Sequence, residues 1–432
     1  MRWPFRRFGL IPLLLTSSLA PGLAWGAELP QPLTLQHAIS LAASAEHPSL
    51  QQLQATTNQA RIALEQIESR QGASVDLTGR LRWKRLQQQG DATLDDHLLT
   101  LSARKPLYDF GYSALESQIA SAWIGQRQSE QQQQIESRKL LILENFFAVL
   151  LTDLQRTLDD ETMTIAYLRF KKKEDKAPTG LYSELDLLQA ESIFQDTRAQ
   201  QKLSEMEQRL SRIRLAEVLN HTESIPSALT APTTTPAEIV SRLAPVEEVQ
   251  QSARADNRQL QHLQQQIEIA RKEVKKEQRG DHPELDAVVE WRENSRVTST
   301  KDRWRASLQF EWPLFDGGAN QQRVALARES LTQAQSALEA EQRRVSEAVS
   351  RLHLQLHALE AKWEADQIAA EYRDFELDRN RALYEQEQQS NFGDALVGVS
   401  ASHLRSAESR FSAILARAKL DHLMGKEIKI NE

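Results

Sequence analysis

The segment that ends at Trp312 alternates strictly between apolar and polar residues. Its apolar positions are Trp304, Ala306, Leu308, Phe310 and Trp312, and its polar positions are Arg303, Arg305, Ser307, Gln309 and Glu311. A period of two predicts a β-strand with one apolar and one polar face. The outer two tryptophans are separated by ~26 Å at ~3.3 Å per residue. An apolar band of that height between aromatic residues is typical of an outer-membrane strand, whose lipid-facing band is about 25 Å tall.

Three other segments show the same alternation less regularly, so four strands are predicted, near residues 73–87, 96–107, 283–293 and 302–313. The predicted aromatic residues at the membrane interface are Trp83, Trp291, Trp304 and Trp312. Lys105 interrupts the apolar side of the second strand, where a lysine can extend its amine toward the interface. Four strands cannot close a membrane barrel, and lipid does not tolerate open strand edges, so a spanning chain must oligomerise. The alternative is a soluble amphipathic hairpin whose apolar face packs on a core.

A short motif occurs twice. The residues PLYDFG from Pro106 to Gly111 return as PLFDGG from Pro313 to Gly318, at an offset of 313 − 106 = 207. Each copy follows a strand pattern and precedes a helical pattern, so both mark a strand-to-helix junction. Proline lacks the N–H that a ladder needs, aspartate can cap a helix, and glycine permits positive φ. The predicted junction residues are Pro106, Asp109, Gly111, Pro313, Asp316 and Gly318.

The helical segments carry a seven-residue spacing after the second junction, at Leu331, Leu338, Val345, Leu352 and Leu359. Such spacing predicts coiled-coil packing along a narrow seam. A helix from 321 to about 388 would extend for ~100 Å at 1.5 Å per residue. This favours either the wall of a tube or a dimeric spacer rod, and periodicity does not distinguish them. Breaks at residues 177–180 and 389–393 predict helix-to-helix turns at the end far from the strands.

The chain divides into repeated units behind an export signal. Basic residues precede an apolar run in the first residues, which predicts a signal peptide over 1–26. Each copy reads as helix, strand, strand, very long helix and shorter helix. The expected segments are a first repeat over 27–221, a linker rich in proline and threonine over 222–237, a second repeat over 238–425, and a tail over 426–432.

Composition excludes several functions. The chain has no cysteine, which rules out disulfides, thiolate metal sites and a cysteine nucleophile. A net charge of −7 argues against a nucleic-acid binder. Neither a nucleophile motif nor a phosphate-binding loop is present. We therefore expect no enzymatic activity, no cofactor and no metal site.

Together, the doubled junction, the order of elements and the signal peptide resemble the TolC family of outer-membrane channels. The stretch from Leu33 to Leu50 is similar to the family's first helix, and the stretch from Arg381 to Gly425 is similar to its last. The resemblance covers essentially the whole mature chain. It implies a mainly α-helical fold with a small β part: a trimer with a periplasmic α-barrel of long helices and four transmembrane strands per chain, which complete a 12-stranded barrel.

The resemblance also implies a function. The chain would be a passive exit duct in the outer membrane, mostly in the periplasm, joined to a periplasmic adaptor and an inner-membrane pump for efflux or type I secretion. Residues at the tip turns would meet the adaptor: Thr179, Gly180, Leu181, Asn391, Phe392 and Gly393. Asp186 and Asp394 are the candidates for the pore constriction. The second copy departs from the family, because the residues from Ser390 to Phe392 replace its glycine-containing turn.

A non-channel periplasmic coiled-coil scaffold or adaptor remains the alternative. Strands bracketed by aromatic residues favour the channel, because a scaffold has no need of them.

Overall fold

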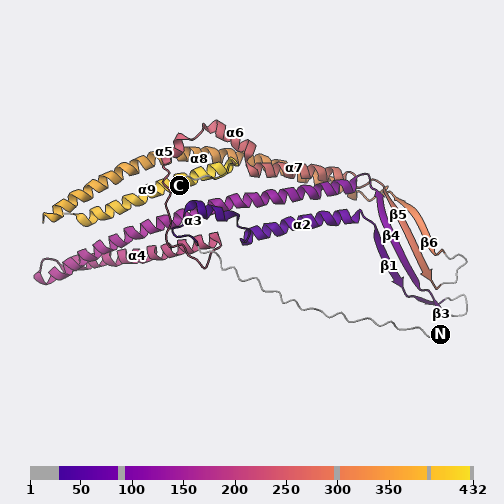
Figure 1. The fold of residues 1–432 in the computed structure, drawn as a ribbon, viewed down its shortest axis with the longest axis horizontal. Helices are drawn as coiled ribbons and strands as arrows, with labels where there is room; N and C mark the ends of the chain where they lie inside the picture. The colour runs from indigo at the N-terminus through magenta and orange to yellow at the C-terminus, as the bar shows by residue number, and fades with distance from the viewer. Residues whose placement is uncertain (1–28, 86–92, 296–301, 387–390, 429–432) are drawn as a thin grey trace.

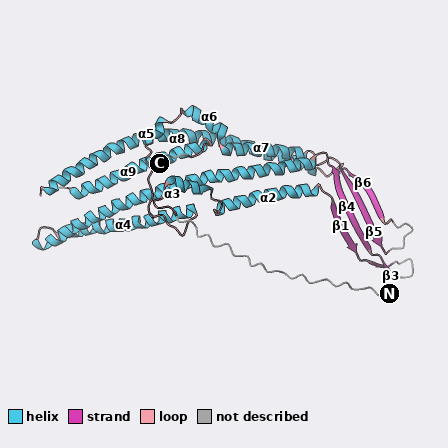
Figure 2. Cartoon of the chain, in the orientation of Figure 1, coloured by secondary structure: helices cyan, strands magenta, loops and turns pink. Residues whose placement is uncertain are grey.

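The computed structural model describes residues 29–85, 93–295, 302–386 and 391–428. The molecule is a long rod of helices with a small β-sheet at one end (Figure 1). Figure 2 shows that the strands all lie at that end and the helices occupy the rest. The predicted fold class, mainly helical with a small sheet and an internal duplication, is confirmed.

Each repeat contains one very long helix, α3 (Tyr112–Lys176) in the first and α8 (Ala319–Glu385) in the second, together with shorter helices. The other helices of the first repeat are α1 (Leu35–Ser40), η1 (Leu41–Ala43), α2 (Pro48–Arg70), η2 (Ala177–Thr179) and α4 (Glu184–Leu219). The remaining helices are α5 (Pro236–Ser241), α6 (Val246–Asp256), α7 (Arg258–Glu277) and α9 (Phe392–Leu423). At 1.5 Å per residue, α3 and α8 each extend for about 100 Å.

The strands form one four-stranded sheet and one short ribbon. The strands are β1 (Ser74–Arg80), β2 (Trp83–Arg85), β3 (Thr93–Asp95), β4 (Leu98–Tyr108), β5 (Glu284–Asn294) and β6 (Trp304–Glu311). The sheet has the order β1-β4-β5-β6, with every neighbouring pair antiparallel, and β2 pairs with β3. The central pairing of β4 with β5 joins the two repeats. Within the described parts of the chain, strands β1 and β6 remain as open edges.

The segment expected as one strand near 73–87 is interrupted, which corrects that prediction. Strand β1 ends at Arg80, and the chain resumes as β2 at Trp83. At the break, the Arg82 guanidinium forms an ion pair with Asp96, whose side chain is only 5% exposed. The Arg82 carbonyl also accepts a hydrogen bond from the Asp96 N–H at 2.7 Å. These contacts redirect the chain, and period-two patterning does not reveal them because the alternation of side chains continues through the break.

The main core lies at the middle of the rod, where helices of both repeats converge. The rings of Phe147 in α3 and Phe411 in α9 stack at a centroid distance of 4.7 Å. Leu33 and Leu35 from the N-terminal segment are fully buried in the same cluster, as is Leu215 of α4. Burying an aromatic or leucine side chain contributes about 1.5–3 kcal/mol. The two repeats are therefore fixed to each other by this core as well as by the sheet.

Four of the five heptad positions of α8 face the core. Val345 and Leu352 are buried, as are Val349 and Leu356 on the neighbouring stripe. Leu338 and Leu359 pack partly buried against the same core. The seven-residue spacing thus forms a seam against other helices, as coiled-coil packing requires.

The expected signal peptide, residues 1–26, lies outside the described residues, and of the expected tail only 426–428 is described. Among the described helices, none combines the length and apolar character needed to cross a membrane.

Candidate functional sites on the sheet and at the helical tip

One face of the four-stranded sheet is apolar across all four strands. The register places Leu77 beside Leu101, Leu101 beside Trp291, and Trp291 beside Trp304. The next row toward the helices contains Val75, Ala103, Val289 and Ala306. Since side chains alternate along a strand, residues in register share a face. The Leu308 side chain is 69% exposed and that of Trp304 73%, so within one chain this apolar face is uncovered.

Of the four tryptophans expected at the membrane interface, three border this face. Trp291 and Trp304 are paired at the end far from the helices. Trp312 follows β6 at the helical end, where its indole N–H donates to the carbonyl of Asp281 at 3.1 Å. Trp83 lies instead in the separate ribbon, with its ring edge-on to His97 at 5.1 Å. Lys105 projects from the apolar face near the helical end, in register with Ala287.

The opposite face of the sheet is polar and cross-linked by ion pairs. Arg104 contacts Asp286 at 3.3 Å on the neighbouring strand. Its guanidinium also donates to Gln309 of β6 at 3.4 Å, which spans three strands on this face. The Arg292 and Glu290 side chains pair at 2.7 Å along β5. The sheet therefore has one face suited to lipid and one suited to water.

The two strand-to-helix junctions use the same hydrogen bonds. The Asp109 carboxylate accepts from the backbone N–H of Gly111 at 3.0 Å and of Ser113 at 2.7 Å. The Asp316 carboxylate accepts from the N–H groups two and four positions later, at 3.0 and 2.6 Å. Burial alone raises the pKa of Asp109, but hydrogen bonds from the Ser113 side chain and from these N–H groups outweigh it and lower the pKa. The first N–H groups of a helix have no hydrogen-bond partner within the helix, and each aspartate supplies an acceptor for two N–H groups at that end.

The glycines at these junctions adopt left-handed backbone conformations, with φ of 81° at Gly111 and 86° at Gly318. Such values favour glycine because it has no Cβ. The prolines differ between the copies. Pro313 follows the end of β6, whereas Pro106 lies within β4 beside a shift in register. A bulge tolerates proline for the same reason as a strand end, because no ladder hydrogen bond is required there.

At the far end of the rod, the first hairpin turn contains three of the expected tip residues. Gly180 has a left-handed φ of 74°, and the Thr179 hydroxyl donates to the Lys176 carbonyl at 2.6 Å. The Leu181 side chain is exposed. These contacts close the turn between α3 and α4.

Asp186 lies in the first turn of α4, where it completes a capping box. Its carboxylate accepts from the Ser183 hydroxyl at 2.6 Å and the Ser183 N–H at 3.0 Å, and its own N–H donates to the Ser183 hydroxyl oxygen at 3.1 Å. These hydrogen bonds from Ser183 lower the pKa of Asp186. The carboxylate is therefore ionised at neutral pH, and its capping contribution is lost only as the pH falls through that lowered pKa.

The other three tip residues lie at the start of α9, just after the second hairpin turn. The Asn391 N–H donates to the Asn380 side-chain oxygen at 3.1 Å. The ring of Phe392 stacks on that of Tyr384 at a centroid distance of 5.8 Å. A Cβ placed on Gly393 would lie 2.8 Å from the Ile165 side chain, so α9 approaches α3 closely here. The turn residues 387–390 lie outside the described part of the chain.

Asp394 forms an ion pair that links the two repeats. Its carboxylate lies 2.6 Å from the guanidinium of Arg169 on α3. Both side chains are more than half exposed, so the pair contributes little to stability. Asp394 and Arg169 also line a groove of about 350 Å³ between α3, α4 and α9. The sequence offered no signal for Arg169, because 225 residues separate the partners (394 − 169).

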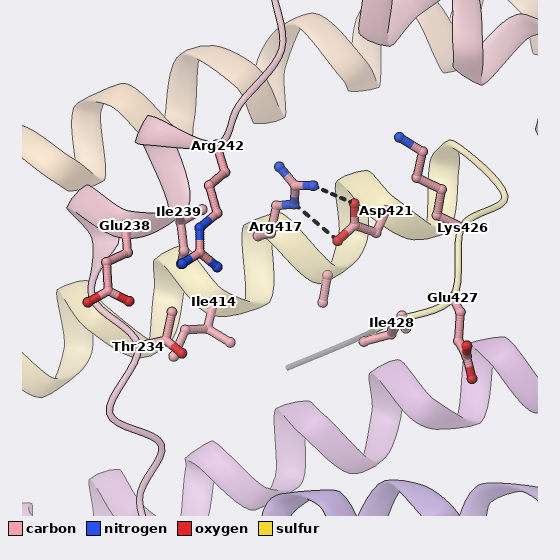
Figure 3. A pocket seen from close by; sticks show the side chains of 11 residues that line it. Thr234, Glu238, Ile239, Arg242, Ile414, Arg417, Asp421, Lys426, Glu427 and Ile428 are labelled. Atoms are coloured by element: carbon pink, nitrogen blue, oxygen red, sulfur yellow. Dashed lines mark hydrogen bonds and ion pairs between the residues drawn. The ribbon is translucent and has the colours of Figure 1, made fainter. Parts of the chain in front are cut away.

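A second pocket lies at the middle of the rod, between α5, α9 and the residues after α9, with a volume of about 270 Å³ (Figure 3). Arg417 and Asp421 form a two-pronged ion pair on its wall, with both contacts at 3.0 Å. Its charged lining comprises Arg242, Arg417, Lys426, Glu238, Asp421 and Glu427. Equal numbers of cations and carboxylates give this pocket no preference for either sign of ligand.

The geometry defines a class of protein, in which an amphipathic sheet with open edges is carried on helices that extend for about 100 Å. The family model for outer membrane efflux proteins matches residues 249–426, which include most of the second repeat. Over these residues the chain matches the outer membrane efflux protein family, and the fold of the chain is TolC-like.

Solved structures share the fold over nearly the whole chain. CusC matches with a TM-score of 0.71 at 17% identity, covering 98% of this chain and 99% of that chain. The CmeC channel of Campylobacter jejuni matches with a TM-score of 0.73 at 12% identity, covering 98% of this chain and 96% of that chain. VceC of Vibrio cholerae matches with a TM-score of 0.68 at 16% identity, covering 91% of this chain and 97% of that chain. No curated protein sequence matches this chain significantly.

Proposed function

We propose that the chain is the outer-membrane exit duct of a tripartite efflux or type I secretion system. Three copies would join their sheets edge to edge, β6 of one to β1 of the next, so that twelve strands enclose a water-filled lumen. The observation that carries this proposal is the sheet itself. It has one uncovered apolar face, one polar face and two unpaired edges, and lipid does not tolerate unpaired strand edges.

The helical rod supports a second part of the proposal. The end of α3 with the start of α4, and the end of α8 with the start of α9, lie at the end of the rod far from the sheet (Figure 1). We propose that this end meets a periplasmic adaptor through the six tip residues, and that the adaptor connects the duct to an inner-membrane transporter. The chain would act by passive conduction, without catalysis. Most of it would lie in the periplasm, behind a cleaved signal peptide over 1–26, with repeats over 27–221 and 238–425.

An outer-membrane duct and the alternative, a periplasmic coiled-coil scaffold, are expected to behave in opposite ways when membranes are washed and extracted. A duct is expected in the outer-membrane fraction, resistant to carbonate washing, and as a trimer whose electrophoretic migration changes on heating, because closed sheets resist detergent. The measurement is fractionation followed by electrophoresis of boiled and unboiled samples. A periplasmic scaffold would be released by the wash and would stay soluble without detergent, and that result would refute the duct.

We also propose that Asp186 and Asp394 form the pore constriction at the tip. Each lies in the first turn of a helix that leaves a hairpin turn, at the same end of the rod. Rings of carboxylates favour cations in a pore. Arg169 offsets part of the charge of Asp394, which moderates that preference.

Removing both charges is expected to reduce the preference for cations. The double variant Asp186→Asn, Asp394→Asn keeps a hydrogen-bond acceptor at position 186, so the capping box at the start of α4 should remain. The measurement is the reversal potential of single channels under a salt gradient, with Asp160→Asn, away from the tip turns on α3, as the control. An unchanged reversal potential in the double variant, with normal channel formation, would remove these residues from the constriction.

A further inference from the structure

Charges on the polar face of the sheet are arranged unevenly along the strands. In the middle rows, arginines are neutralised by nearby carboxylates: Arg104 by Asp286 at 3.3 Å, and Arg292 by Glu290 at 2.7 Å. Toward the end far from the helices, Arg305 contacts Asp302 at 3.4 Å. These pairs contribute no net charge.

Two arginines at the end far from the helices have no such partner in the described part of the chain. Arg80 is the last residue of β1, and Arg303 immediately precedes β6. We call these residues the outer arginine pair. One ends and the other precedes an edge strand, so closure of the sheet between neighbouring subunits brings Arg303 of each copy to the same boundary as Arg80 of the next. The trimer would then carry uncompensated positive charge around its outer mouth.

The helical end of the same face carries the opposite charge. Glu284 and Glu311 are directly in register on β5 and β6, and the described residues provide neither with an ion pair. Like charges placed opposite each other on neighbouring strands are unfavourable, so this pairing costs stability rather than adding to it. We call these residues the inner glutamate pair. Asp76 of β1, in register with Ser102, is one further carboxylate that forms no ion pair with the described residues, nearer the middle of the face.

We propose that the outer arginine pair and the inner glutamate pair are specificity-determining residues, which give the lumen a positive exit and a negative entrance. This inference rests on the proposed channel function, because it requires the polar face to line the lumen. Rings of arginine favour anions in a pore, and rings of carboxylates favour cations. Anionic solutes are attracted at the exit, and cationic solutes at the entrance from the helical barrel.

Such a polarised lumen conducts unequally in the two directions. When the outer compartment is negative, anions enter at the arginines and cations enter at the glutamates, so both accumulate in the middle and the current rises. The opposite voltage draws both kinds of ion out of the middle, and the current falls. The effect requires the charges to reach across the lumen. It is therefore strong where the Debye length is ~10 Å, at 0.1 M salt, and weak where it is ~3 Å, at 1 M salt.

The experiment records trimers inserted from one side of a planar bilayer, at equal voltages of both signs. At 0.1 M potassium chloride the current is expected to be ~2-fold larger with the outer compartment negative, and nearly symmetric at 1 M. The double variant Arg80→Gln, Arg303→Gln is expected to abolish the asymmetry at 0.1 M. Lys105→Gln removes a positive charge from the apolar face of the same sheet and should retain the wild-type asymmetry.

Two failures are distinguishable. If the protein gives no ion-conducting trimers at all, the proposed function fails and this inference fails with it. If conducting trimers form, but their current is symmetric or its asymmetry is unchanged in the double variant, the duct stands and the polarised lumen is refuted. Equal loss of asymmetry in Lys105→Gln would also refute it, because the effect would then not belong to the polar face.

Discussion

Replacing Leu308 with arginine is expected to prevent stable insertion of the trimer in the outer membrane. Leu308 lies on the apolar face of β6, midway between Trp304 and Trp312, so a spanning sheet places it near the bilayer midplane. An arginine facing lipid at that depth costs about 2–4 kcal/mol per copy, and three copies are present in a trimer. The measurement is the amount of wash-resistant, heat-modifiable trimer in the outer-membrane fraction.

The matched control is Ser307→Arg, which adds the same charge one position earlier on the polar face. We expect this variant to insert at nearly the wild-type level, because its arginine would face water. Equal loss of trimer in both variants would mean that the two faces of the sheet do not differ in environment. That outcome would contradict a membrane-spanning sheet.

The second large effect is expected for Gly425→Ala, at the end of α9. Gly425 adopts φ of 67°, its N–H donates to the His422 carbonyl at 3.1 Å, and the N–H of Lys426 donates to the Asp421 carbonyl at 2.9 Å. This is the glycine-dependent helix ending known as the Schellman motif. An added Cβ would lie 2.2 Å from the backbone oxygen of Asp256, so the backbone of one segment must move.

For Gly425→Ala we expect the free energy of unfolding to fall by about 3 kcal/mol or more. The left-handed backbone strain of about 1–2 kcal/mol is added to the steric conflict with Asp256. The measurement is the midpoint of thermal unfolding, followed by circular dichroism. Gly180→Ala is the control. It has a similar φ of 74°, but no atom lies within 4 Å of the added Cβ, so only the strain remains. Equal shifts of the unfolding midpoint in the two variants would show that the close approach to Asp256 contributes nothing to the loss of stability.

The contrast between these two glycines shows where sequence reasoning ends. Both can be recognised as turn residues from their neighbours in the chain. Only the tertiary structure distinguishes them, because Asp256, the residue that makes one position intolerant, lies 169 positions away (425 − 256) on a different helix. The same limit applies to Arg169, whose pairing with Asp394 no local pattern predicts.

The sequence by itself determined the alternation that makes an amphipathic strand, the seven-residue seam of α8, and the doubled junction with its aspartate and glycine. These features depend on contacts between residues a few positions apart, so periodicity and local chemistry are enough to reveal them. The tertiary structure decided the pairing of β4 with β5, the break after Arg80, and the separation along the polar face of arginines and glutamates that have no ion pair within the described ranges. Those features depend on register between distant segments, and the energy of a register is shared among many side chains that are not adjacent in the chain.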